Sequence, residues 1–231
     1  MILYFIIGIV LLITSIIIAI IIFSLSSQTS ITVVGWGNNL SGQIKIPSEL
    51  TNVNVKAISA GGLHSLALKE DGTVVGWGNN DYAQIKIPDG LKNVKVKAIS
   101  AGGYHSLALK EDGKVVHWGY NEDGWITIPS GLTNVKAISA GMFHSLALKE
   151  DGTVVGWGNN MDGQIKIPSE LTDVNVKAIS AGEYHSLALK EDGTVVGWGN
   201  NLDGQIKIPS ELTNVNVKAI SAGGLHSLAL I

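Results

Sequence analysis

The sequence predicts an all-β fold that consists of five repeats of about 41 residues and follows one long hydrophobic helix. Three observations lead to this prediction. A tryptophan and a histidine recur together along residues 31–231, Glu-Asp-Gly recurs between short apolar segments, and residues 1–23 carry no charge. No 3.6-residue periodicity occurs in the repeats, which excludes a helical solenoid.

Residues 1–23 are predicted to form one continuous helix. Eleven of them are isoleucine, and a helix of this length reaches about 35 Å, enough to cross a hydrocarbon core. A signal peptide is the alternative, but the basic n-region and small-residue cleavage site are missing. We therefore expect a transmembrane or filament-core helix, followed by a polar linker at residues 24–30. Small or polar side chains that would permit close helix packing are Gly8, Thr14, Ser15 and Ala19.

Tryptophan and histidine mark each repeat. The tryptophans are spaced by 41 or 39 residues, and a histidine usually follows 28 residues later. The marker residues are Trp36, Trp77, Trp118, Trp157 and Trp198, with His64, His105, His144, His185 and His226. The shorter spacing comes from a two-residue deletion in the third copy. Such a deletion preserves the alternation of the two faces along a strand.

One unit is predicted to contain three short strands. Residues 56–60 and 64–68 form the first two, and 74–77 form the third. Asp71-Gly72 predicts a type I′ hairpin turn, because Asp-Gly supplies the positive φ angles that this turn needs. Residues 85–88 are expected to be a short extended stretch that ends at proline. Repeated units of this size suggest blades around an axis, as in a β-propeller.

The string AGGLHSLALKEDGTVVGWGNN, residues 60–80, resembles the RCC1 repeat. Its brevity is similar to the bacterial short-repeat branch that includes the β-lactamase inhibitor protein BLIP-II. The resemblance covers residues 31–231 and implies a β-propeller. Family members include a nucleotide-exchange factor, enzyme inhibitors and surface proteins, so the resemblance indicates the fold more than the function. Family propellers usually have seven blades, whereas five copies are present here.

The two ends of the repeat region are predicted to share one blade. Residues 226–231 are followed by no Glu-Asp-Gly turn and no Trp strand, while residues 32–36 repeat that strand at the beginning. We therefore expect residues 31–38 to pair antiparallel with residues 226–230. This pairing would close a five-bladed ring and cover both exposed sheet edges.

Composition excludes several classes of chemistry. All 16 basic residues are lysine, which argues against a nucleic-acid partner because phosphate and guanine recognition favour arginine. There is no cysteine. The histidines are expected to serve the scaffold by bonding a neighbouring loop carbonyl, since equivalent positions of a propeller lie on a ring rather than around one ion. The tryptophans are expected to pack between blades. The sequence predicts no catalytic, cofactor-binding or metal-binding residue, and so no enzyme.

Function is expected where the copies differ, in the loop after each Trp-Gly-Asn and in the pair of residues before each histidine. Aromatic and Met side chains there are candidate anchors for a partner, although they could instead simply cover the top of the propeller. These candidates are Tyr82, Tyr104, Tyr120, Trp125, Met142, Phe143 and Tyr184.

Two functions remain open at this point. The first is a membrane-anchored, surface-displayed module that binds a protein or a glycan. The second is a subunit of an extracellular pilus-like filament, in which helices 1–23 self-associate as the core and propellers form the coat. Position 5 is Phe5, where bacterial type IV pilins usually have glutamate.

Overall fold

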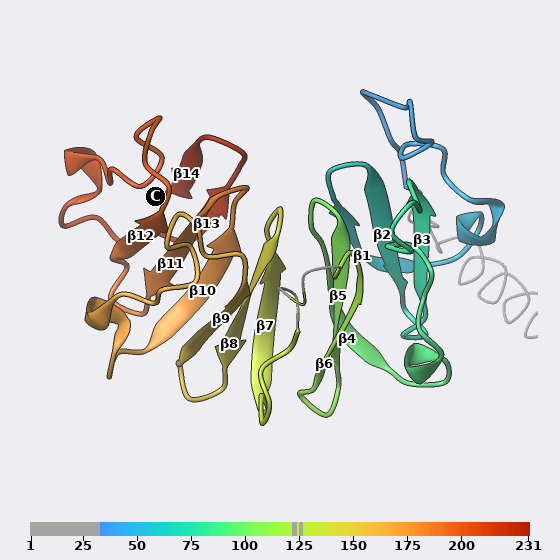
Figure 1. Ribbon diagram of the computed structural model, residues 1–231, viewed down its shortest axis with the longest axis horizontal. Coiled ribbons are helices and arrows are strands. Elements are labelled where there is room, and N and C mark those ends of the chain that lie inside the picture. Colours follow the sequence, from blue (N-terminus) through green and yellow to red (C-terminus); the bar gives the residue numbers. More distant parts are fainter. Residues whose placement is uncertain (1–32, 122–123, 125–126) are drawn as a thin grey trace, which may run out of the picture.

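The computed structural model describes residues 33–121, 124 and 127–231, which form a row of five antiparallel sheets (Figure 1). Four sheets have three strands and the fifth has two. The strands are β1 (Val55–Ala60), β2 (His64–Lys69), β3 (Val74–Gly78), β4 (Val96–Ala101), β5 (His105–Lys110), β6 (Val115–Gly119), β7 (Val135–Ala140), β8 (His144–Lys149), β9 (Val154–Gly158), β10 (Val176–Ala181), β11 (His185–Lys190), β12 (Val195–Gly199), β13 (Ala219–Ala222) and β14 (Ser227–Leu230). The all-β prediction, with three strands in a complete repeat, is confirmed.

The middle strand of each complete sheet carries the core. In β2, Leu66, Ala67 and Leu68 are all fully buried, because the strand is covered on both faces. The leucines pack across to the next sheet, where they meet Val96 and Trp118. The core therefore lies between neighbouring sheets. The predicted packing of tryptophan between blades is confirmed for Trp118, Trp157 and Trp198, whereas Trp36 is 84% exposed.

The hairpin turn differs from the predicted type I′ form. Only the glycine of Asp71-Gly72 has a positive φ, +86°, whereas a type I′ turn needs two such residues. The amide of Lys69 donates to the carbonyl of Thr73 (2.9 Å), and the amide of Gly72 donates to the carbonyl of Lys69 (3.0 Å). Glu70 thus extends the loop to three residues, which favours a turn followed by one left-handed glycine.

The segment after each tryptophan strand is a folded loop rather than the extended stretch that was predicted. Ile85 lies in a turn, and its amide donates to the side-chain oxygen of Asn80 (3.3 Å). Buried Gln84 donates to the side-chain oxygen of Asn79 (2.6 Å). Side-chain bonds of this kind offer the backbone an alternative to strand pairing. Four such loops end in short 3-10 helices: η1 (Ser48–Leu50), η2 (Asp89–Leu91), η3 (Ser169–Leu171) and η4 (Ser210–Leu212).

The predicted closure of a five-bladed ring is not confirmed. Residues 33–38 form no strand, and among the described residues β14 pairs only with β13. The first and last sheets lie at opposite ends of the long axis of the molecule (Figure 1). Whether the ends of such a row meet depends on the rotation from each sheet to the next, and the repeat pattern does not encode that angle.

The predicted helix of residues 1–23, including Gly8, Thr14, Ser15 and Ala19, lies outside the described residues, as does the linker at 24–30. Within the part of the chain that is described, no helix has the length and apolar character needed to span a membrane.

Candidate functional site: a groove and an aromatic cluster

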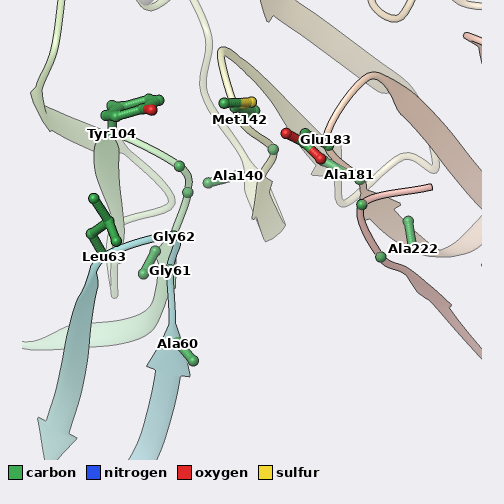
Figure 2. A pocket seen from close by; sticks show the side chains of 17 residues that line it. Ala60, Gly61, Gly62, Leu63, Tyr104, Ala140, Met142, Ala181, Glu183 and Ala222 are labelled. Atoms are coloured by element: carbon green, nitrogen blue, oxygen red, sulfur yellow. The ribbon is translucent and has the colours of Figure 1, made fainter. Parts of the chain in front are cut away.

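A groove of about 500 Å³ runs along the row of sheets where the first strand of each sheet ends (Figure 2). Each of the five repeats contributes its Ala-Gly turn and the one or two residues that follow. The lining segments are 60–63, 101–104, 140–142, 181–183 and 222–224. The groove is therefore formed by the same turn repeated five times.

Glycine in these turns allows neighbouring repeats to approach closely. The amide of Gly62 donates to the carbonyl of Gly102 (3.0 Å), and the amide of Gly103 donates to the carbonyl of Gly141 (3.0 Å). A Cβ atom added at Gly61 would overlap the carbonyl oxygen of Gly102. The floor of the groove consequently consists of backbone and methyl groups.

Four longer side chains distinguish the repeats within this floor. Figure 2 labels Leu63, Tyr104, Met142 and Glu183 among the lining residues. Glu183 is the only charged residue in the lining. The groove therefore combines an apolar wall with one carboxylate.

Four aromatic side chains form a cluster, here called the aromatic cluster, which consists of Tyr82, Tyr104, Tyr120 and Phe143. Tyr104 stacks on Phe143 with ring centroids 5.1 Å apart and planes inclined by 18°. Tyr82 meets Tyr104 edge-on at 5.7 Å and Tyr120 at 5.0 Å. Edge-to-face and stacked pairs of this kind stabilise an aromatic group beyond its area of contact. Because Tyr104 also lines the groove, the cluster and the groove form one surface.

The remaining partner-binding candidates are distributed around this surface. Met142 lines the groove itself. Tyr184 is partly buried. Its burial is the main cause that raises the pKa of its hydroxyl, and the neighbouring charge of Glu183 is the second. Trp125 lies outside the described residues. The structure thus brings together four of the predicted aromatic rings and places Met142 beside them, while their role in binding stays a prediction.

Sequence reasoning missed two components of this site. Glu183 was seen only as part of a variable pair before His185, and nothing in the sequence gave it a role. The contribution of Ala60 and its four equivalents was missed because invariant small residues resemble ordinary strand ends. The repeated Ala-Gly string is the signal that could have identified the floor.

The histidines bond a serine of the next repeat rather than a loop carbonyl. Ser106 Oγ donates its single proton to the carbonyl of Gln84 (2.8 Å), so His64 Nε2 must be the donor to Ser106 Oγ (2.8 Å). His64 therefore carries a proton on Nε2. The equivalent pairs are His105 with Ser145, His144 with Ser186 and His185 with Ser227.

Burial makes these histidines poor proton acceptors. Burial lowers the pKa of His64 to about 4. Burial is also the main reason that the pKa values of His105 and His144 are lowered to about 3. Their Nδ1 atoms are buried with no hydrogen-bond partner among the described residues. Within the same residues no three His, Cys, Asp or Glu side chains are grouped so that they could hold a metal ion. The groove itself offers apolar contact, backbone hydrogen-bonding groups and one carboxylate.

Comparison with known proteins identifies the repeat. A family model described as the regulator of chromosome condensation (RCC1) repeat matches residues 55–84, 96–124, 135–164 and 176–205. A search by sequence among curated proteins finds no match.

Solved structures share the fold. Prp20p from Saccharomyces cerevisiae has a TM-score of 0.62 at 24% identity, with 77% of this chain and 56% of that chain covered. Human WBSCR16 has a TM-score of 0.66 at 20% identity, with 77% and 59% covered. The CRINKLY WD40 ectodomain of the Arabidopsis thaliana receptor kinase ACR4 has a TM-score of 0.67 at 20% identity, with 88% and 71% covered. The chain thus spans less than two thirds of the length of the first two.

Proposed function

The chain belongs to the RCC1 repeat family, and from that premise we propose that it is a protein-binding module. The observation that carries the proposal is the junction of the groove and the aromatic cluster at Tyr104. Aromatic side chains in a concave surface are typical anchors of protein interfaces. Among structural neighbours, Prp20p has binding properties to Gsp1p and histones, and Kap60 has been solved bound to yeast RCC1 (Prp20).

The groove suits an extended segment of a partner. Its floor of glycine and alanine lets a second backbone approach, and Tyr104 and Met142 offer apolar contact. Tyr82, at the rim of the aromatic cluster, keeps 38% of its surface exposed and can extend that contact. Glu183 favours a lysine or arginine side chain, because an opposite charge is the partner that a partly buried carboxylate needs.

Selection from a library of displayed 12-residue peptides tests the proposal. Immobilised full-length chain should enrich peptides that combine aromatic or aliphatic residues with a basic one. Tyr104→Ala should weaken the selected peptides at least about tenfold, which corresponds to the loss of one interface anchor. Glu183→Gln should weaken only the peptides that carry a basic residue.

Leu202→Ala is the matched control, because Leu202 is a highly exposed loop residue outside the groove lining. It should bind the selected peptides as the unmodified chain does. The proposal fails if the selected peptides bind the Tyr104→Ala and Leu202→Ala variants equally well, or if no peptide is enriched.

We expect no enzymatic activity, since the groove offers a single carboxylate and the Nε2 atoms of His64 and its equivalents are engaged by serine. The short repeats also support the narrower assignment to the bacterial branch that includes BLIP-II, whose propellers grip a protein through loop aromatics.

Placement at a membrane or cell surface is the last part of the proposal, and the uncharged residues 1–23 support it. A lipid-anchored module should float with phosphatidylcholine vesicles as dispersed single copies. A pilus-like filament should instead appear in negative-stain microscopy, and Gly8→Leu or Ala19→Leu should abolish it by blocking close helix approach. Chain that neither floats nor forms filaments would exclude both placements.

A further inference from the structure

Residues 33–37 and the two-stranded β13–β14 sheet match different parts of one three-stranded sheet. Residues 33–37 have the sequence VVGWG, identical to β3, β9 and β12, the third strands of three complete sheets. Trp36 is 84% exposed, whereas its equivalent Trp77 is 7% exposed. At the other end of the row, Leu228 in β14 is 63% exposed, whereas its equivalent Leu66 is fully buried. Each part exposes the face that the other would cover.

Residues 33–37 form no strand in one copy but share two local features with the paired strand β3. Gly37 has a φ of +105°, and its equivalent Gly78 has +104°. A Cβ atom added at Gly35 would lie 2.9 Å from Ile44 Cβ, and one added at Gly76 would lie 3.0 Å from Ile85 Cβ. The segment therefore holds the same relation to its following loop as a paired strand does. Little ordering entropy would be lost when it pairs.

We propose that residues 33–37 of one copy of this chain complete the β13–β14 sheet of a second copy. The occupant is a second copy because the β14 strand of the same copy lies at the opposite end of the row (Figure 1). In the complete sheets Ser65 pairs with Trp77, Leu66 with Gly76 and Leu68 with Val74. The same register places Ser227 opposite Trp36, Leu228 opposite Gly35 and Leu230 opposite Val33.

A specific hydrogen bond supports this register. The carbonyl of Gln43 accepts from Ser65 Oγ and from Trp77 Nε1, both at 2.8 Å. The carbonyl of Gln205 accepts from Ser227 Oγ (2.7 Å) but, among the described residues, from no indole. Trp36 of a second copy would take the equivalent position and donate the bond that Trp77 and Trp198 make in their own sheets, whereas Trp118 and Trp157 Nε1 have no partner among the described residues.

The contacts between sheets would also be repeated across the junction. Within the chain, His185 Nε2 bonds Ser227 Oγ (2.9 Å), and the amide of Ala222 donates to Ser180 Oγ (2.9 Å).

At the junction, His226 of one copy would meet Ser65 of the other, and the amide of Ala60 would meet Ser221 Oγ. A hollow of about 250 Å³ on the first sheet, lined by Trp36, Ile58 and Ala60, would receive β13 and β14. The contact is head-to-tail, so repetition gives a ring or a fibre according to the rotation per copy.

Cysteine cross-linking of the full-length chain tests the proposal, because the chain contains no cysteine of its own. Val33→Cys and Leu230→Cys chains are mixed in equal amounts and exposed to a mild oxidant. Residues directly opposite on antiparallel strands are about 4.5–5.5 Å apart at Cα, within the range of a disulfide. We expect a disulfide-linked dimer of the two variants, at least about tenfold more abundant than with the control pair Val33→Cys and Leu202→Cys.

Three results would overturn the proposal. The first is no dimer above the control pair, and the second is equal dimer in both pairs. The third is that a Val33→Cys, Leu230→Cys double variant loses both thiols while it keeps the mass of one chain, because this shows closure within a copy.

A second variant keeps the test independent of disulfide geometry. Leu228→Asp, added to the Leu230→Cys chain, places a charge that is solvated in one copy and buried at the junction. It should lower the dimer yield at least tenfold, while Leu202→Asp in the same chain leaves the yield unchanged. Undiminished yield with Leu228→Asp contradicts the proposed register.

Discussion

His64 Nε2 donates a hydrogen bond of 2.8 Å to Ser106 Oγ, and the two residues belong to neighbouring repeats. Both side chains are fully buried. The serine in turn bonds the carbonyl of Gln84, so one chain of hydrogen bonds joins two sheets and the loop between them. A buried polar group that loses its partner costs free energy. Moving one sheet relative to the next would break these bonds, so they help to fix how the two sheets pack.

Ser106→Ala should lower the free energy of unfolding by about 1–3 kcal/mol, the cost of leaving buried polar groups without partners. The variant removes the acceptor of His64 and the donor to Gln84 together. Urea unfolding followed by tryptophan fluorescence measures the change. Ser130→Ala, at an exposed position, is the control and should match the unmodified chain. Equal stability of the two variants would show that the buried bonds contribute nothing net.

Stability should fall as the pH falls from about 6.5 to about 4. Burial lowers the pKa of His64 from 6.5 to about 4. It is also the main reason that the pKa of His144 is lowered to about 3. In this window the unfolded chain binds more protons than the folded chain, so the free energy of unfolding decreases by up to about 1.4 kcal/mol per pH unit for each histidine. Asp151, whose pKa is lowered to about 2 first by its bond to Lys149, titrates below the window.

Urea unfolding at pH 7, 6, 5 and 4 measures this dependence. His64→Gln cannot be protonated in this range and should reduce the slope by up to one proton. Unfolding free energies that stay constant from pH 7 to pH 4 would mean that the histidines are accessible to protons in the folded state.

Metal removal should leave the protein unchanged. His64 Nε2 is committed to Ser106, and a Cβ atom added at Gly61 would lie only 3.0 Å from His64 Nδ1, so the glycine sits closely against that nitrogen. A ligand nitrogen must reach about 2.1 Å from zinc, for which this arrangement leaves no space. Thermal unfolding with and without EDTA should therefore give the same midpoint. Stoichiometric zinc in purified protein, together with a midpoint lowered by EDTA, would contradict this.

Local features of the fold were predictable because the residues that determine them recur in every repeat. The strand around Leu66 and the Asp71-Gly72 turn are determined by neighbours in the sequence, and both elements are found where they were expected. The type of turn was not predicted correctly, because the extra loop residue Glu70 changes which positions need a positive φ.

Relations between repeats were not predictable from the pattern. Tyr104 and Phe143 were chosen because they vary, yet their stacking depends on how one sheet is rotated onto the next. The partner of His64 is 42 residues away, in a serine that every copy contains, so variation gives no signal for it. Pairing of residues 31–38 with 226–230 within one chain was expected because residues 32–36 repeat the third strand of a sheet. Among the described residues β14 pairs only with β13, because sequence identity does not encode the rotation from one sheet to the next.

The turn glycines provide the last test, because they set the spacing of the groove. A Cβ atom at Gly61 would overlap the carbonyl oxygen of Gly102, a rigid backbone atom. Gly61→Ala should therefore force two sheets apart and lower the free energy of unfolding by about 1–3 kcal/mol, as overpacking does. Gly90→Ala is the matched control, since a Cβ there meets nothing within 4 Å and Gly90 is not among the positive-φ residues. It should unfold as the unmodified chain does. Equal urea midpoints for both variants would mean that neighbouring turns can separate without cost.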